Sequence, residues 1–505
     1  MTGRALRKWV VRAAIAALLF YTPITSVNPA SRLALIESIL SRGTPDTRDS
    51  RFFNRLDMVY EDGHFYSDKP PVLALYSTAV IAPVYGPLSF DRDPAGKILY
   101  WFVVASASGL ALLILVFATR ALHRVDGGRV PWPWLAAGIV AGTCVLPFAR
   151  TYNDHIMEAA VLLVAFALLR AGAESPGMRR PLAVGSLIGL AWLLHPLVGS
   201  VTAVTTGLYY LLRGAGGGLG HRALLVSVFS AGTMGTIALG TALHAGLYDR
   251  AVPFYFSPEL YLWTGGPGGV ESHWLSEPTV PGLTVERITT RFEDLGLSEE
   301  RLENTLWLFE AHSERVRNPI RFALQRLFRY GQLTFTPLVL FCLLLAAASI
   351  RGGRRKYRAE TVWALLSVAG LVAASIGLRA VPGGSFGDRH LLPVVPLLVA
   401  AGGLAAVTAR EAGLFRALAL LSMAIVIPGA LAPWVTPGDT FLAVNLGITS
   451  LALLGAVLVW RSAEESATGR AWSRLGAALT DRRVFVLVAG FAALEVVLDL
   501  QTLPA

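Results

Sequence analysis

The chain of 505 residues is 54% hydrophobic and only 15% charged, and its mean hydropathy is +0.55. A soluble domain needs a polar surface that this composition cannot supply, and apolar runs of about 18 or more residues recur along the whole length. The net charge of +10 would suit a nucleic-acid partner, but the basic residues lie in short connectors between apolar runs, where they set membrane topology. Composition and charge therefore exclude a soluble domain and a nucleic-acid-binding protein, and they predict an all-α polytopic membrane protein.

The first apolar run, 9–27, follows a basic N-terminal segment and resembles a signal peptide. The residues after it, Val27-Asn28-Pro29-Ala30, form a poor cleavage site because Pro29 stands where a flexible residue is needed. We expect an uncleaved first span in the cell membrane, with the N-terminus in the cytoplasm.

Basic connectors recur along the chain, and short connectors rich in Lys and Arg lie on the cytoplasmic side. Three apolar runs, near 9–27, 70–88 and 98–119, precede the basic connector at 120–129. That connector lies on the same side as the N-terminus if two of the three runs cross the membrane. We therefore expect that one of them does not cross.

The run at 70–88 is the weakest of the three. It opens with Pro70-Pro71, and Pro83 and Pro87 shorten any helix near its end. We predict that this run lies in or dips into the outer interface, so that 28–97 forms one large external loop.

With that parity, every later basic connector falls inside, and the total is about thirteen spans. A second external loop, 248–330, contains a charged helical segment around 298–317 and separates residues 1–247 from residues 331–505. The remaining spans are expected near 132–148, 155–171, 181–195, 197–213, 222–247, 331–350, 361–379, 390–409, 413–434, 440–460 and 484–501.

Four polar motifs interrupt the apolar runs, and this topology places all of them outside. Ionisable residues at the ends of spans are costly and often functional, so four motifs facing one compartment indicate a single external site. The motifs are Glu61-Asp62-Gly63-His64-Phe65-Tyr66-Ser67-Asp68-Lys69-Pro70-Pro71, Arg150-Thr151-Tyr152-Asn153-Asp154-His155, His195-Pro196 and Gly383-Gly384-Ser385-Phe386-Gly387-Asp388-Arg389-His390.

Each motif also has a purely structural interpretation. Asp68 and Lys69 would suit a local ion pair that anchors the chain at the interface. Asp154 precedes an apolar helix and would suit its N-cap, which does not exclude a function. His195, directly before Pro196, would suit a helix end, and Asp388-Arg389-His390 would simply flank the next span.

The segment 31–43 has the spacing of an amphipathic helix on the outer surface, with Gly43 as its stop. Its apolar residues recur at near-helical intervals, at Leu33, Ile36, Ile39 and Leu40.

Several carboxylates follow this helix and form an external platform suited to acid–base chemistry on a lipid-linked substrate. They are Asp46, Asp49 and Asp57. A divalent cation is a further possibility, because Asp154, His155 and Glu158 could assist one, although their spacing defines no metal site.

The order of these features resembles the GT-C superfamily of membrane glycosyltransferases, which includes protein O-mannosyltransferases and the lipid A aminoarabinose transferase. Asp68-Lys69-Pro70-Pro71 is similar to the family motif that ends a large first external loop. Tyr152-Asn153-Asp154 resembles an acidic motif at the start of a span, and the stretch 383–393 resembles a Gly-x-Arg-Tyr-Leu-Leu-Pro motif.

The resemblance implies a sugar donor linked to polyprenyl phosphate and an acceptor hydroxyl on an envelope glycan, lipid or protein. Transfer would occur on the extracytoplasmic face, normally with inversion, and a carboxylate of the first loop would be the general base. Lys69 matches the family lysine that contacts the donor phosphate, and Arg389 is a second phosphate candidate, with His390 beside it. Other site candidates are His64, Asp68 and His155.

One departure from the family pattern affects the assignment of the general base. The family's acidic pair usually follows the first span immediately, whereas this chain has Val27-Asn28-Pro29-Ala30 there. The base must then be another residue, or the activity is altered or lost. We favour Asp46, at a proline turn after the predicted surface helix, over Asp57 and Asp49.

Three alternatives remain open. A transporter or flippase for a lipid-linked sugar would carry charges at mid-membrane depth and paired broken helices. A polysaccharide polymerase or ligase would rely on arginines, so that Asp46 and Asp57 would be dispensable. A non-catalytic relative would fit the missing early carboxylate.

Overall fold

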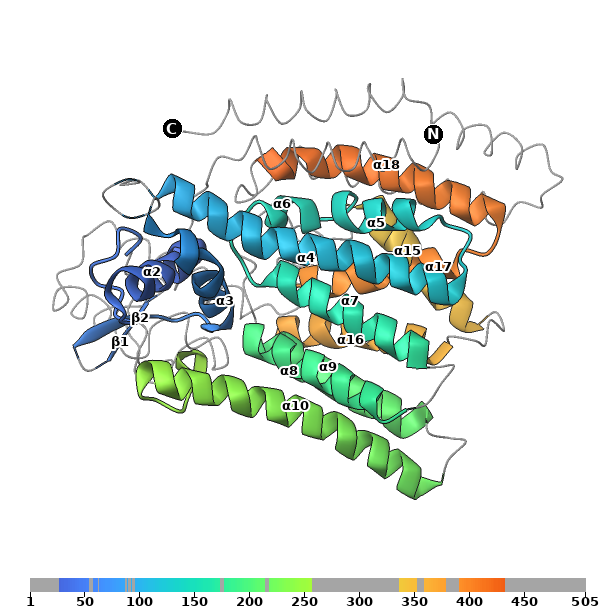
Figure 1. Cartoon of the computed structure of the whole chain (residues 1–505). Helices are drawn as coiled ribbons and strands as arrows, with labels where there is room; N and C mark the ends of the chain where they lie inside the picture. The colour runs from blue at the N-terminus through green and yellow to red at the C-terminus, as the bar shows by residue number, and fades with distance from the viewer. Residues whose placement is uncertain are drawn as a thin grey trace, which may run out of the picture.

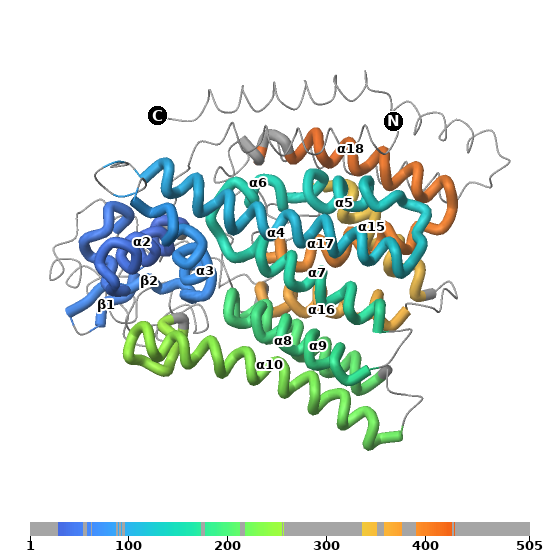
Figure 2. The backbone as a smooth tube through the Cα atoms, viewed as in Figure 1, coloured from blue at the N-terminus to red at the C-terminus, as the bar shows by residue number. Residues whose placement is uncertain are grey.

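The computed structural model is described over most of the chain between Val27 and Leu431. The described residues, 27–53, 58–61, 63–86, 89, 92, 96–172, 177–213, 218–256, 336–351, 358–377 and 390–431, form helices and one β-hairpin (Figures 1 and 2). The predicted spans near 440–460 and 484–501 and the predicted helix at 298–317 lie outside these residues.

A small unit of helices and a hairpin lies at one end of the long helices, on the left of Figure 1. Helix α2 packs on α3 and on β2. The strands are antiparallel, with Met58 opposite Ser67, and the turn residue Gly63 has a φ of +85°, which favours glycine. The elements are α2 (Val27–Arg42), β1 (Met58–Glu61), β2 (His64–Ser67), α3 (Val72–Ile81) and η1 (Ala82–Val84).

Among the described residues, three helices are long and apolar enough to cross a membrane, namely α4 (Lys97–Asp126), α7 (His155–Gly172) and α10 (Leu219–Tyr248). Together with the composition they make this a membrane protein. By contrast, Val72–Val84 is a shorter apolar segment. The expectation that 70–88 does not cross the membrane stays a prediction.

The other helices lie alongside these three (Figure 1). Helix α10 packs on α8 and α9, α4 on α7, and α16 on α9, while α18 packs on α5 and α15. Their bounds are α5 (Trp132–Ala141), α6 (Val145–Ala149), α8 (Arg179–Leu194), α9 (Pro196–Arg213), η4 (Phe254–Phe256), α15 (Pro337–Arg351), α16 (Arg358–Gly377), η9 (Leu392–Val394), α17 (Val395–Ala405) and α18 (Ala409–Leu431).

The run predicted as one span at 132–148 is not one continuous helix, because the chain breaks between α5 and α6. The Thr143 hydroxyl donates to the Ile139 carbonyl at 2.6 Å and accepts from the Val145 N–H at 3.2 Å. A side chain that bonds to nearby backbone groups offers the chain an alternative to continued helix. The apolar run is therefore continuous in sequence but not in helical structure.

Helix α2 also differs from its prediction. It begins at Val27, earlier than expected, and ends at Arg42 before Gly43, whose φ of +68° confirms the predicted stop. It is not a surface helix, because every residue from Ser31 to Ser38 is buried. The polar residue Glu37 is satisfied internally by Arg51, at 2.6 Å.

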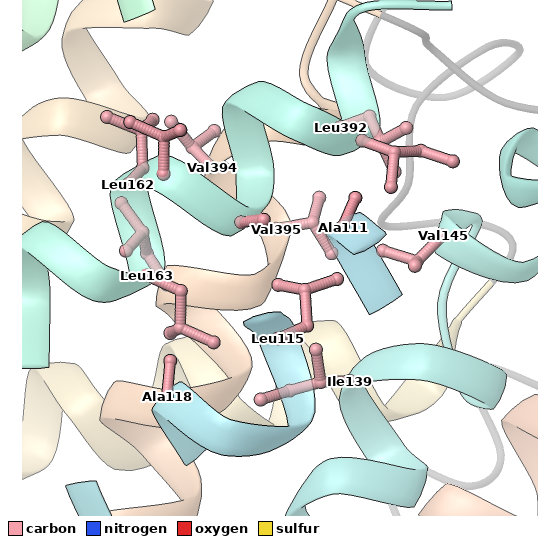
Figure 3. Packing of buried hydrophobic residues seen from close by; sticks show 14 of the residues in the cluster. Ala111, Leu115, Ala118, Ile139, Val145, Leu162, Leu163, Leu392, Val394 and Val395 are labelled. Carbon is pink, nitrogen blue, oxygen red and sulfur yellow. The ribbon is translucent and has the colours of Figure 1, made fainter. Parts of the chain in front are cut away.

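The apolar core continues through the helical layers. Figure 3 shows side chains of α4 packed with those of α5, α6, α7, η9 and α17. The labelled residues are Ala111, Leu115, Ala118, Ile139, Val145, Leu162, Leu163, Leu392, Val394 and Val395.

Helices α8 and α10 approach each other at glycines. A Cβ at Gly185 would lie 2.1 Å from the Phe229 carbonyl oxygen, and one at Gly232 would lie 2.3 Å from the Leu182 carbonyl oxygen. Small residues allow this backbone contact between membrane helices. The crossing fixes α10 against α8, whose C-terminal end leads into the candidate site.

Candidate active site

Two consecutive residues of α2 join two of the predicted motifs. The Ser31 hydroxyl lies 2.6 Å from that of Ser67 and donates to Asp68 Oδ1 at 3.4 Å. Arg32 Nη2 donates to Asp154 Oδ2 at 2.5 Å, and both side chains are buried. The motif that contains Asp68 and Lys69 and the start of α7 are therefore tied to adjacent positions of one helix.

Lys69 lies where β2 leads into α3. Its Nζ donates to Asp68 Oδ2 at 2.7 Å, so the local ion pair predicted for these residues is present. Its backbone N–H donates to Ser67 Oγ at 3.3 Å, which fixes the chain before Pro70-Pro71. The Lys69 side chain keeps 17% of its surface exposed, whereas Asp68 keeps 4%.

Asp68 and Lys69 line a partly open hollow. Its walls come from the start of α3, the joint between α8 and α9, and the end of α10. They are largely apolar, and they include Pro71, Trp192, Pro196, His244 and Phe254. One charged pair at the edge of an aromatic and proline-lined hollow is typical of a ligand site.

Asp154 occupies the N-cap position of α7 through its backbone, because its carbonyl accepts from the Glu158 N–H at 2.9 Å. The side-chain acceptor at this helix start is instead Asn153 Oδ1, which receives the His155 N–H at 3.1 Å. Burial alone would raise the pKa of Asp154, but the Arg32 charge outweighs it, and the pKa lies below its ordinary value. Asp154 is therefore an ionised carboxylate.

Tyr152 links the same motif to α3. Its buried hydroxyl donates to the Leu73 carbonyl at 2.9 Å and lies 2.8 Å from Ser77 Oγ. Burial raises the pKa of this phenol, so it stays a neutral hydroxyl. The contact holds the start of α7 against the helix that follows Lys69.

Three histidines meet beside Asp154. His155 opens α7, His195 joins α8 to α9, and His390 precedes η9. Their ring centres are 5.5, 5.6 and 5.9 Å apart, and all three residues are buried. His195 takes an extended backbone, with φ −152° and ψ 107°, as expected before proline.

Asp46 lies elsewhere, beside the turn end of the hairpin. Its Oδ1 accepts the backbone N–H groups of Arg48 and Phe65 at 3.0 and 3.2 Å, and its Oδ2 lies 2.8 Å from His64 Nδ1. Burial raises the pKa of Asp46, but these hydrogen bonds outweigh it and lower the pKa overall. Three extended residues, about 10 Å, separate Phe65 from Asp68. Asp46 and His64 therefore stabilise the hairpin and are not gathered with Lys69.

The remaining predicted residues divide into two groups. Asp49 is exposed on the loop after α2 and contacts no other predicted site residue that the structure describes. Asp57 and Arg389 lie outside the described residues.

Sequence reasoning missed Arg32, which pairs with Asp154. In the helix predicted over 31–43, it shares a face with the apolar residues Ile36 and Ile39, because positions i, i+4 and i+7 align. A charged residue on an apolar stripe was the available signal. His195 was interpreted as a helix end, which it is, but it also joins the histidine cluster.

No family model and no curated protein matches the chain. Among solved structures, ArnT from Cupriavidus metallidurans bound to undecaprenyl phosphate has a TM-score of 0.46 and 16% identity, covering 96% of this chain and 75% of that one. The apo Archaeoglobus fulgidus oligosaccharyltransferase has a TM-score of 0.46 and 14% identity, covering 94% of this chain. This chain spans 60% of that oligosaccharyltransferase.

Both proteins are GT-C glycosyltransferases, the superfamily that the sequence motifs resemble. At such identities and TM-scores no substrate and no residue role passes from them to this chain.

Proposed function

We propose that the protein transfers a sugar from a polyprenyl-phosphate donor to an acceptor hydroxyl. The observation that carries the proposal is the junction at Ser31 and Arg32, which ties the Lys69 motif to Asp154 across the described fold. The donor class comes from the resemblance of Asp68-Lys69-Pro70-Pro71 to its family motif.

Lys69 is the proposed phosphate ligand. It is a partly exposed cation at the edge of a hollow whose walls include Trp192 and Phe254. An ammonium suits the phosphate, and apolar walls suit the first prenyl units of the donor. Phosphate binding would draw Lys69 away from Asp68, which is its partner in the free protein.

We assign the general base to Asp154 in preference to Asp46. Asp154 is ionised and connected to the Lys69 motif through α2, whereas Asp46 is held by three donors at the hairpin. Its pairing with Arg32 makes Asp154 a weak base, so removal of the proton would come late, after the bond to the leaving group has begun to break.

In the proposed reaction the acceptor oxygen forms a bond to the anomeric carbon while the bond from that carbon to the phosphate oxygen breaks. The acceptor proton passes to the carboxylate, and the electron pair leaves with polyprenyl phosphate, whose charge Lys69 stabilises. Attack opposite the leaving group inverts the anomeric centre. We further propose about thirteen spans, a cytoplasmic N-terminus and an extracytoplasmic site, as the charge pattern predicts.

The test is transfer by the purified full chain in lipid, with a panel of radiolabelled polyprenyl-phosphate sugars and a membrane extract as acceptor. We expect loss of transfer in Lys69→Ala and Asp154→Asn, and retained transfer in Asp46→Asn. Lys97→Ala, at an exposed lysine, is the matched control. Loss in Asp57→Asn with retention in Asp154→Asn would move the base to Asp57. No transfer by the unaltered chain from any donor would favour a transporter or a non-catalytic relative.

A further inference from the structure

Two polar side chains of α10 line the hollow that also contains Asp68 and Lys69. They are Thr241 and His244, which lie on one face of the helix because they are three positions apart. The walls of the hollow are otherwise largely apolar, and a few polar groups in such a site fix the orientation of a ligand. Each of the two side chains has a hydrogen-bonding atom that no group among the described residues satisfies.

His244 is only 3% exposed, and one of its two ring nitrogens is engaged. Its Nδ1 donates to the Arg250 carbonyl at 2.8 Å, and the Arg250 side chain pairs with Glu61 of β1, which holds that segment in place. A neutral imidazole that donates through Nδ1 has its acceptor lone pair at Nε2. Within the part of the chain that the structure describes, Nε2 forms no hydrogen bond. An unpaired acceptor on a buried ring that lines a hollow points to a ligand that donates.

Thr241 differs from the other two threonines of α10. Thr233 and Thr236 donate to the carbonyls of Phe229 and Gly232, four positions earlier, at 3.1 and 3.0 Å. A hydroxyl that bonds to its own helix in this way is satisfied locally. The Thr241 hydroxyl forms neither this bond nor any other with the residues that the structure describes. It therefore offers a donor and an acceptor to a ligand in the hollow.

We infer that Thr241 and His244 bind hydroxyl groups of the donor sugar. The inference rests on the proposed function, which assigns the donor phosphate to Lys69. In such a donor the phosphate is bonded directly to the anomeric carbon, so the sugar must lie within one ring of Lys69. Lys69, Thr241 and His244 line the same hollow. A sugar hydroxyl can donate to Nε2 of His244, and a neighbouring one can exchange a hydrogen bond with Thr241.

These two residues, called the α10 pair below, would determine which donor sugar is accepted. The class that fits is a neutral sugar with two adjacent free hydroxyl groups. A site that hydrogen-bonds a substrate hydroxyl rejects an analogue that lacks it, because the buried groups of the site are then left unpaired. Removal of either hydroxyl from the sugar should therefore weaken binding by about threefold to tenfold, the effect of one hydrogen bond.

The test measures binding to the purified full chain in detergent by isothermal titration calorimetry. The probes are geranyl phosphate and the geranyl-phosphate forms of glucose, galactose, mannose and arabinose. Monodeoxy forms of the sugar probe that binds most tightly are then compared with it. We expect at least one sugar probe to bind more tightly than geranyl phosphate, and we expect this advantage to fall when one of two adjacent hydroxyls is removed.

Two variants test the residues themselves. Thr241→Val removes the hydroxyl, and His244→Asn removes Nε2 while it keeps a donor for the Arg250 carbonyl. Each should weaken binding of the sugar probe by about threefold to tenfold and leave binding of geranyl phosphate unchanged. Thr236→Val, at a threonine of α10 that is bonded to its own helix, should change neither. Lys69→Ala should weaken binding of every probe, because it acts on the phosphate.

The inference is overturned if no sugar probe binds the unaltered chain more tightly than geranyl phosphate, a result that depends on no variant folding. It is equally overturned if Thr241→Val and His244→Asn both keep the full advantage of the sugar probe. The proposed role of Lys69 is tested separately, by the affinity for geranyl phosphate and its loss in Lys69→Ala.

Discussion

Arg32 and Asp154 form a buried ion pair, with 2.5 Å between Nη2 and Oδ2, across 122 positions of the chain. The pair joins α2 to the start of α7. Taking two charges out of water is costly, and removing only one of them leaves the other buried without compensation. The relationship therefore makes a thermodynamic prediction that can be tested without knowing the substrate.

Arg32→Met should be strongly destabilising, by about 3–5 kcal/mol, because it leaves the Asp154 carboxylate buried without its partner. The double variant Arg32→Met with Asp154→Leu should recover most of this loss. Thermal unfolding in detergent measures both, with Arg179→Met, at an exposed arginine, as the control. Additive effects of the two substitutions would contradict the coupling.

Gly232→Ala should destabilise the contact of α10 with α8, because the new Cβ would lie 2.3 Å from the Leu182 carbonyl oxygen. Gly235→Ala, in the same helix with nothing within 4 Å of its added Cβ, should be neutral or slightly stabilising. The comparison is made by thermal unfolding midpoint. Equal effects at both positions would argue against the close crossing.

Tyr152→Phe should cost about 1 kcal/mol, because it leaves the Leu73 carbonyl without its buried donor. Tyr60→Phe, at a tyrosine that is 42% exposed, should change stability little. The measurement is the free energy of unfolding of the two variants under identical conditions. A loss in Tyr60→Phe as large as that in Tyr152→Phe would contradict a specific role for the contact.

Asp46 should stabilise the fold in a pH-dependent way. Its pKa in the folded protein lies below its ordinary value of 3.8, so the stabilisation is full above that value. It is lost as the pH falls through the lowered folded pKa. The difference in unfolding midpoint between the unaltered chain and Asp46→Asn should therefore be constant near neutral pH and shrink below about pH 4.

The control for this series is Asp49→Asn, at an exposed carboxylate on the same loop. A difference between the unaltered chain and Asp46→Asn that persists unchanged into acid would show that the hydrogen bonds of Asp46 do not require its charge.

Helix positions could be predicted where an apolar run is bounded by strong signals. The run predicted at 155–171 is observed as His155–Gly172, and the runs at 181–195 and 197–213 are separated at His195-Pro196 as expected. The break at Thr143 was missed although the sequence carries signals for it, namely Gly142 and Pro147, whose ring cannot follow the Thr143 carbonyl in a continuous helix.

The candidate site was predictable only in part. Lys69 and Asp154 could be assigned to one region from the charge pattern and the motifs, and the structure does connect their segments through α2. The role of Arg32 and the burial of α2 come from contacts between distant segments, which periodicity cannot report. Asp46 was favoured from its position after a predicted surface helix, and that helix proved to be buried.

The most direct test of sugar transfer is release of polyprenyl phosphate from a radiolabelled polyprenyl-phosphate sugar. The unaltered chain, Lys69→Ala and Lys97→Ala would be compared in lipid with an acceptor extract. We predict release by the unaltered chain and by Lys97→Ala, and a loss of at least about tenfold in Lys69→Ala, since preorganised charge at a leaving group is worth several kcal/mol. Equal release by Lys69→Ala would contradict the assignment of Lys69 to the donor phosphate, and no release by any of the three would contradict glycosyl transfer itself.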